Sequence, residues 1–224
     1  MKKAIIFDMD GLMFDSERAT YEGYVEICRE YGYGMRMEFY KKLLGCPLPT
    51  ARKYLREEYG EAFPMEETIG KVHEYLETRF AAEGVPKKKG LTEILEYARE
   101  AGFSCLVATS SGRDRVDGIL RMAGVTDYFA DVICGNEVQR GKPHPDIFLK
   151  GCEKLCCAPG EAWVLEDSEV GVAAAYEAGI SCICVPDMKE PSKECREKAA
   201  YVVDSLLEAM EIIRKEKELE KDDL

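Results

Sequence analysis

The chain contains 224 residues, of which 46% are hydrophobic and 33% are charged. This mixture is typical of a folded globular protein and argues against a chain that is disordered throughout. The 31 Lys and Arg residues against 43 Asp and Glu residues give a formal net charge of −12. General binding of nucleic acids or of anionic membrane surfaces is therefore not expected, because both need clustered basic side chains.

Targeting and membrane signals are also limited by the sequence. No apolar run approaches the roughly 18 residues that a membrane helix needs. The opening stretch, MKKAIIFDMDG, places acidic residues directly after a short apolar run, unlike the apolar centre of a secretion signal. We therefore expect a cytoplasmic protein without a membrane partner, and a monomer by default.

Ten cysteines are a large number for a chain with only two histidines. No two of them form a C-x-x-C pair, and neither histidine lies at zinc-finger spacing. Several cysteines lie within apolar stretches such as SCLVA and SCICV. We expect reduced, mostly buried thiols that behave as small hydrophobic side chains, with a redox role or a metal site as the alternatives.

The predicted elements begin with a strand at residues 4–7. This apolar run lacks polar alternation, which suits a strand buried on both faces of a parallel sheet. Residues 16–84 are rich in Glu, Lys, Arg and Tyr and are interrupted by Gly and Pro, and they predict about four helices without a strand. The segment GVPKKKG that follows is typical of a linker.

From residue 91 onward, predicted helices and strands alternate. The strands are expected at residues 103–108, 131–134, 162–165, 180–185 and 201–203, with helices at 91–102, 112–122, 145–155 and 170–178 and a last helix from about 206. This order predicts an α/β fold whose core is a doubly wound, Rossmann-like parallel sheet. The helical block is then an inserted α-helical cap domain, which gives a core of residues 1–15 and 88–224 and a cap of residues 16–87.

Polar residues that follow the predicted strands form the candidate site, because ligands of such sheets bind beyond the carboxyl ends of the strands. Taken singly, each motif has an ordinary structural interpretation, such as a turn, a helix N-cap or a solvated loop lysine. Their shared position at one edge of the sheet points to a site. The motifs are Asp8-Met9-Asp10-Gly11, Thr109-Ser110-Ser111-Gly112, Gly141-Lys142-Pro143 and Glu166-Asp167-Ser168.

The acidic residues of these motifs predict a metal ion. Asp8 and Asp10 leave the strand on the same side, so they repel each other unless a cation or a shared proton compensates. Glu166 and Asp167 add to this negative charge. Carboxylates without His or Cys partners favour a hard ion, and Mg²⁺ fits best because it binds one or two carboxylates together with phosphate and water.

The remaining polar residues of the motifs predict a phosphate site. Thr109 and Ser110 precede a predicted helix, whose N-terminus offers hydroxyl and free N–H groups to an anion. Lys142 can hold a phosphoryl oxygen as a point charge.

As a set and in this order, the motifs resemble those of the haloacid dehalogenase superfamily, and they cover the whole core. The helical insertion is similar to the small α-helical cap of the branch that contains β-phosphoglucomutase and many sugar-phosphate phosphatases. This resemblance implies a Mg²⁺-dependent enzyme that acts on a small phosphorylated metabolite. It disfavours dehalogenation, because an acid occupies residue 10.

Roles for the acidic residues are implied by the resemblance. Asp8 would be the nucleophile that forms an aspartyl-phosphate, and Asp10 would be the general acid and base. Mg²⁺ would be held by Asp8, by the main-chain carbonyl of Asp10 and by Asp167. Glu166 would lie on the ion or behind these ligands.

The resemblance also implies which groups bind the substrate. Thr109, the Ser110 amide and Lys142 would hold the phosphoryl oxygens as charge develops on them. A cap loop containing Gly45 would reach the substrate, and the cap would exclude bulk water from the reaction.

The sequence departs from the β-phosphoglucomutase pattern in the cap. Thr20 occupies a position where that group has His, and Arg52 comes slightly too late to grip a second phosphate. Arg52, Lys53 and Arg18 could substitute, although each is more typical of a solvated helix face. We therefore favour a phosphatase of sugar-phosphate-like monoesters and keep the hexose phosphate mutase as the alternative.

Two more distant classes remain to be weighed against the enzyme. A receiver domain also carries a phosphorylated Asp, an acidic cluster and a Lys, but it lacks an acid two residues after that Asp and an insertion of this size. A non-catalytic binding protein on the same fold would be expected to have lost a motif position, and none is lost here.

Overall fold

The computed structural model describes residues 1–44, 46 and 48–222. Two compact units divide the chain: a core of Met1–Phe14 and Lys87–Leu224, and a cap of Asp15–Pro86. The boundaries expected from the sequence lie one residue further along the chain at each junction.

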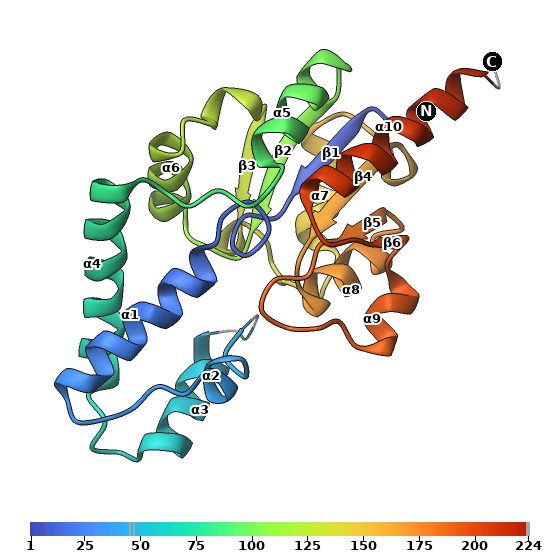
Figure 1. Cartoon of the computed structure of the whole chain (residues 1–224). Coiled ribbons are helices and arrows are strands. Elements are labelled where there is room, and N and C mark those ends of the chain that lie inside the picture. The colour runs from blue at the N-terminus through green and yellow to red at the C-terminus, as the bar shows by residue number, and fades with distance from the viewer. Residues whose placement is uncertain (45, 47, 223–224) are drawn as a thin grey trace. The chain divides into compact units, whose positions relative to one another are not determined.

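The core is built on a six-stranded sheet in which every adjacent pair of strands is parallel (Figure 1). The strand order is β3-β2-β1-β4-β5-β6. The strands are β1 (Ala4–Phe7), β2 (Ser104–Thr109), β3 (Asp131–Cys134), β4 (Ala162–Glu166), β5 (Ser181–Cys184) and β6 (Tyr201–Val202). The predicted doubly wound parallel sheet is therefore confirmed.

Strand β1 lies in the middle of this sheet, between β2 and β4. After β1 the chain builds β2 and β3 on one side, and it then crosses back to build β4, β5 and β6 on the other side. The connections that follow β1 and β4 therefore lead to opposite sides of the sheet, and the order of the strands reverses between these two neighbours. Such a switch point is where open α/β sheets bind their ligands.

The apolar run of β1 is explained by burial on both faces of the sheet. All four of its side chains are fully buried. Ala4 and Ile6 belong to a hydrophobic cluster that includes Phe148 of helix α7 (Asp146–Lys154) and Val172 of helix α8 (Glu169–Glu177). Phe7 points to the opposite face and meets Phe129 edge to face, with 5.6 Å between the ring centroids. A strand covered on both faces has no reason to alternate apolar and polar residues.

The core helices cover the two faces of the sheet. Helices α7 and α8 pack on one face, whereas α5 packs on β2 and against α10 on the other. The core helices are α5 (Leu91–Glu100), α6 (Arg113–Met122), α7 (Asp146–Lys154), α8 (Glu169–Glu177), α9 (Lys193–Lys198) and α10 (Leu206–Asp222). Three short 3-10 helices, at Thr126–Tyr128, Gly135–Glu137 and Pro159–Glu161, and helix α9 were not expected from the sequence.

The cap contains α1 (Ser16–Glu30), α2 (Met37–Tyr40), α3 (Leu48–Tyr59) and α4 (Met65–Glu83). Helices α1 and α4 pack together, and Gly23 of α1 leaves room for the ring of Tyr75. An aromatic cluster fills the other part of the cap, where Tyr59 stacks near Phe63 with 4.8 Å between the ring centroids. Tyr59 thus contributes to the cap's own core.

Two short linkers join cap and core. On the core side, the Lys88 N–H donates to the Met13 carbonyl at 2.9 Å, and Phe14 forms an antiparallel bridge with Lys87. On the cap side, the Asp15 N–H donates to the Pro86 carbonyl at 2.9 Å. The chain therefore leaves and re-enters the core through two segments that are hydrogen-bonded side by side.

The ten cysteines all lie among the described residues, and all are free thiols. Seven are buried: Cys28, Cys105, Cys134, Cys152, Cys182, Cys184 and Cys195. Burial raises the pKa of the Cys105 thiol to about 12, which keeps it protonated and inert. The structure therefore agrees with the expectation of reduced, mostly buried cysteines. Among the described helices, none is long and apolar enough to cross a membrane.

Candidate active site

The candidate site lies at the carboxyl ends of β1, β2 and β4, at the switch point of the sheet. The register pairs Phe7 with Val107 on one side and with Leu165 on the other. Asp8, the next residue, donates its N–H to the Leu165 carbonyl at 3.0 Å. Asp8 therefore continues the parallel ladder by one residue. The residues beside it are Ala108 on β2 and Glu166 on β4, and these three residues form one row across the sheet.

Lys142 joins Asp8 to Glu166 within this row. Its Nζ lies 2.5 Å from Asp8 Oδ1, 2.7 Å from Glu166 Oε1 and 3.0 Å from the Ala108 carbonyl. These three acceptors use all three N–H donors of the ammonium group. The side chains of Lys142, Asp8 and Glu166 are 3%, 10% and 0% exposed. A lysine that sequence alone could not separate from a solvated loop residue thus lies at the centre of the site.

Burial dominates the electrostatics of this row. It raises the pKa of Asp8, with Glu166 and Asp10 adding to the rise and the Lys142 ammonium opposing it. Burial by itself would lower the pKa of Lys142, but the carboxylates of Asp8 and Glu166 raise it above its usual value. The lysine therefore stays cationic. Its positive charge opposes, without cancelling, the rise that burial gives to the pKa of Asp8.

Glu166 anchors the loop that follows β4. Its Oε2 accepts hydrogen bonds from the N–H groups of Asp167 and Ser168 at 3.0 and 2.9 Å, and from the Ser168 hydroxyl at 2.9 Å. A Cβ on Gly171 would lie 1.8 Å from Glu166 Oε1, which explains why this position is a glycine. Both oxygens of Glu166 are thus engaged, one by Lys142 and one by the loop.

Asp167 is brought against the loop that follows β1. Gly11 has a φ of +83°, and a Cβ on it would lie 2.2 Å from Asp167 Oδ2. Only glycine allows both this backbone conformation and this close approach. The two motifs at the ends of β1 and β4 therefore meet, as expected for residues that share a ligand.

Asp10 has partners of its own, different from those of Asp8. The Ser111 hydroxyl donates to Asp10 Oδ2 at 2.7 Å, and Arg115 Nη2 donates to Asp10 Oδ1 at 2.7 Å. Arg115 was missed by the sequence analysis. It is one of three arginines on α6, and no pattern separates it from Arg113, which pairs with Glu137 instead.

The predicted phosphate-binding residues end β2. Thr109 is buried, and its Oγ1 accepts the Ser111 N–H at 3.1 Å, so this hydroxyl also stabilises the turn before α6. Ser110 is exposed on the same turn. The carbonyl of Ser110 lies close to Gly135, where a Cβ would approach it to 2.9 Å. The turn is thus held on both sides, with the Ser110 side chain at the surface.

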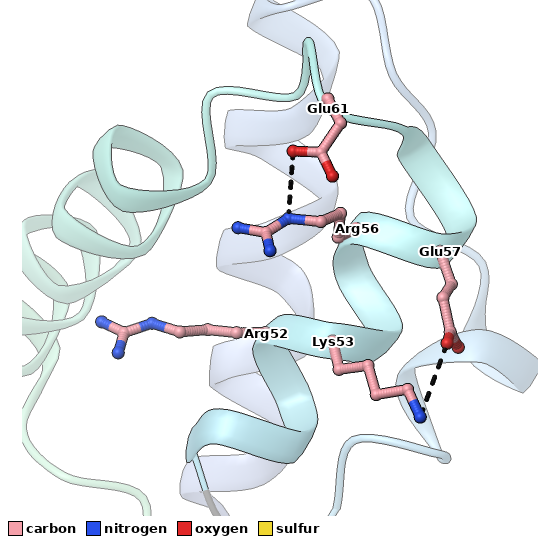
Figure 2. Close-up of a pocket in the computed structure, with 5 residues that line it drawn as sticks. All are labelled: Arg52, Lys53, Arg56, Glu57 and Glu61. Atoms are coloured by element: carbon pink, nitrogen blue, oxygen red, sulfur yellow. Dashed lines mark ion pairs between the residues drawn. The ribbon is translucent and has the colours of Figure 1, made fainter.

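The cap residues considered for a second phosphate are paired with acids. Arg18 pairs with Asp15 at 3.3 Å, and Arg52 pairs with Glu66 at 2.9 Å. In a pocket along α3, Lys53 faces Glu57, Arg56 faces Glu61, and Arg52 points away from both pairs (Figure 2). The Thr20 hydroxyl donates to the Ser16 carbonyl at 2.8 Å within α1. Gly45, the predicted substrate contact, lies outside the described residues.

The residues present fit a hard divalent cation that keeps part of its water shell. Within the described part of the chain, no group of three or more His, Cys, Asp or Glu side chains is arranged so that it could hold a metal ion. The donors predicted from the sequence are oxygens: the carboxylates of Asp8 and Asp167 and the main-chain carbonyl of Asp10. The empty space at the Cα of Gly11 lets Asp167 approach the loop after β1. This open oxygen set is the kind that Mg²⁺ accepts, because it leaves positions for water and phosphate.

Comparison with known proteins agrees with this arrangement. Residues 5–185 match the family model of haloacid dehalogenase-like hydrolases. The chain belongs to this family. It is 32% identical over 181 residues to a phosphorylated carbohydrates phosphatase of Thermotoga maritima, covering 81% of this chain and 83% of the relative.

Solved structures of related proteins share the whole fold. A Thermotoga maritima protein provisionally designated a β-phosphoglucomutase superposes with a TM-score of 0.80 at 28% identity, covering 96% of this chain and 99% of its own. CbbY from Rhodobacter sphaeroides, in complex with phosphate, has a TM-score of 0.77 at 25% identity, covering 92% and 95% of the two chains. The resemblance found in the sequence is confirmed. The chain is an enzyme of this family, and its phosphatase-named relatives support a phosphoric monoester hydrolase.

Proposed function

We propose that this enzyme is a Mg²⁺-dependent phosphatase of small phosphorylated metabolites, with sugar-phosphate-like monoesters as its substrate class. The observation that carries the proposal is the division of two carboxylates that are only two residues apart. Asp8 is paired with the buried Lys142, whereas Asp10 is paired with Ser111 and Arg115. Two acids in different surroundings are suited to two different roles.

Asp8 is the nucleophile of this mechanism. One of its oxygens attacks phosphorus, the bond between phosphorus and the ester oxygen breaks, and an aspartyl-phosphate forms. Asp10 gives a proton to the departing alkoxide. Asp10 then takes a proton from a water molecule that attacks the aspartyl-phosphate, which releases inorganic phosphate and restores both carboxyl groups.

Phosphoryl oxygens are held by groups that surround Asp8. Lys142 contributes a fixed positive charge, and Thr109 and the Ser110 amide contribute hydrogen bonds from the end of β2. Asp8, the main-chain carbonyl of Asp10 and Asp167 would hold Mg²⁺, with Glu166 behind them as the anchor of Lys142. When bound, the ion would offset negative charge on the phosphoryl group.

Substrate choice is assigned to the cap, including the predicted substrate contact Gly45. The T. maritima relative is named for phosphorylated carbohydrates, which supports sugar-phosphate-like esters for this chain. A hexose phosphate mutase is the second candidate, favoured by the fold shared with the provisional β-phosphoglucomutase. The pairing of Arg18, Arg52 and Lys53 with cap acids favours the phosphatase, because it leaves those cations neutralised.

The test is a screen of phosphorylated metabolites that compares kcat/KM with Mg²⁺ and after removal of metal by EDTA. We expect release of inorganic phosphate that EDTA abolishes and added Mg²⁺ restores. A hexose 1-phosphate supplied with its bisphosphate primer separates the two candidates. Isomerisation without phosphate release would overturn the phosphatase in favour of the mutase.

A further inference from the structure

Asp10 is held at both oxygens by the connection between β2 and α6. Ser111 approaches Oδ2 from the loop, and Arg115 approaches Oδ1 from the first turn of α6, each at 2.7 Å. The carboxylate is 19% exposed and the Arg115 side chain 33% exposed, so the pair lies at the rim of the site rather than in the core.

The two partners differ in what they can do with a proton. A guanidinium group donates hydrogen bonds and never accepts one. A hydroxyl group both donates and accepts, and it rotates to suit its partner. The Arg115 contact therefore holds one carboxylate oxygen of Asp10 in place, and the Ser111 hydroxyl can adapt to the other oxygen.

We propose that Arg115 is a positioning residue for Asp10, an inference that rests on the proposed function. Arg115 fixes the orientation of the Asp10 carboxyl group through Oδ1, and Ser111 supports it through Oδ2. In this orientation Asp10 faces the leaving group in the first step and the attacking water in the second.

This role has a consequence that a purely structural ion pair would lack. An alkyl phosphate has a poor leaving group, so its cleavage depends on a correctly placed proton. A p-nitrophenyl phosphate has a good leaving group and needs no proton to depart. A disoriented Asp10 therefore slows the formation of the aspartyl-phosphate from the alkyl ester much more than from the aryl ester.

The experiment measures kcat/KM for glycerol phosphate and for p-nitrophenyl phosphate in Arg115→Met, which keeps the length of the side chain without its donors. We expect a fall of about 100-fold for the alkyl ester and less than about 5-fold for the aryl ester, following the usual size of general acid catalysis. Arg115→Lys, which restores a donor, is expected to recover part of the alkyl activity. Arg121→Met, at an exposed position of the same helix, is the matched control and leaves both values unchanged.

A second measurement, the burst of p-nitrophenolate, reports on the second step, in which water hydrolyses the aspartyl-phosphate. Because Asp10 is also the base of the second step, the Met variant accumulates aspartyl-phosphate and gives a burst of p-nitrophenolate of about one equivalent per enzyme, and absence of a burst would overturn the role in that step. Equal falls for the two esters, or no fall for either, would overturn the positioning role. Absence of phosphate release from both esters in the unaltered enzyme would overturn the proposed function itself, and the two failures are thereby distinguished.

Discussion

Gly11 and Asp167, which are far apart in the sequence, are in contact across the ends of β1 and β4. A methyl group on Gly11 would lie 2.2 Å from Asp167 Oδ2 and 2.8 Å from its Cγ. The missing side chain of Gly11 therefore makes room for the Asp167 carboxylate, which we propose as a metal ligand.

Gly11→Ala is expected to impair the enzyme more than it destabilises the fold. The added methyl group pushes Asp167 away, which should lower kcat by at least about 10-fold and raise the Mg²⁺ concentration needed for half-maximal activity. Gly102→Ala is the matched control, because Gly102 also has a positive φ, +75°, but a Cβ there meets nothing within 4 Å. Both variants should lose about 1 kcal/mol of stability from backbone strain. An equal loss of activity in the two would contradict the assignment of Asp167.

Lys142→Met is expected to destabilise the core strongly. It leaves the carboxyl groups of Asp8 and Glu166 buried without their cation, at a cost of about 3–5 kcal/mol in the free energy of unfolding. Lys53→Met, which removes an exposed ion pair on α3, should change that free energy by less than about 0.5 kcal/mol. Urea unfolding measures both values.

The same site allows stability to be separated from activity. Adding Glu166→Gln to Lys142→Met removes one of the two unpaired charges, so the double variant should regain part of the lost stability without regaining phosphate release. If the loss of unfolding free energy in the double variant equalled the sum of the losses in the two single variants, the two side chains would not be coupled, and this prediction would be wrong.

Asp8→Asn should abolish turnover while keeping the fold. Asparagine retains an oxygen for Lys142 but is not a nucleophile, so we expect the rate of phosphate release to fall by about 10³-fold or more. The exposed Asp127→Asn serves as the control for the chemical change. Trapping of ³²P on the protein after acid quench should be lost in Asp8→Asn alone. Retention of full activity would disprove the nucleophile assignment.

Thiol labelling under native conditions should reach few of the ten cysteines. Cys156 is exposed and should react first, followed by the half-buried Cys46 and Cys157. Cys105 should stay unreactive up to pH 9, because its pKa of about 12 lies above that range and leaves almost no thiolate. Denaturant should expose all ten. Rapid native labelling of Cys105, located by mass spectrometry, would show that the core opens more easily than the packing implies.

Much of the core could be predicted because its signals are local. The apolar run of β1 and the acids directly after it fix both a buried strand and a site at its end. Residues 131–134 were predicted as a strand with the bounds of β3. Helix α9 was missed because it has six residues and only Cys195 is buried among them, too short for a periodic pattern.

The contacts of the site were less accessible to sequence reasoning. Lys142 lies 134 residues from Asp8, so the sequence placed the two at the same edge of the sheet but could not predict their direct contact. Glu166 could be placed on or behind the metal ligands, and its two engaged oxygens support the second position. Arg115 carried no signal, because its partner is determined by how α6 meets the loop after β1.

The paired linkers of the cap have a consequence for how such enzymes diversify. Their contacts join main-chain atoms of residues 13–15 to those of 86–88, and main-chain bonds do not depend on which side chains follow. An alternative insert whose two ends meet in the same way could be grafted at this junction without disturbing the catalytic half. The core and the inserted segment can thus vary independently within one chain.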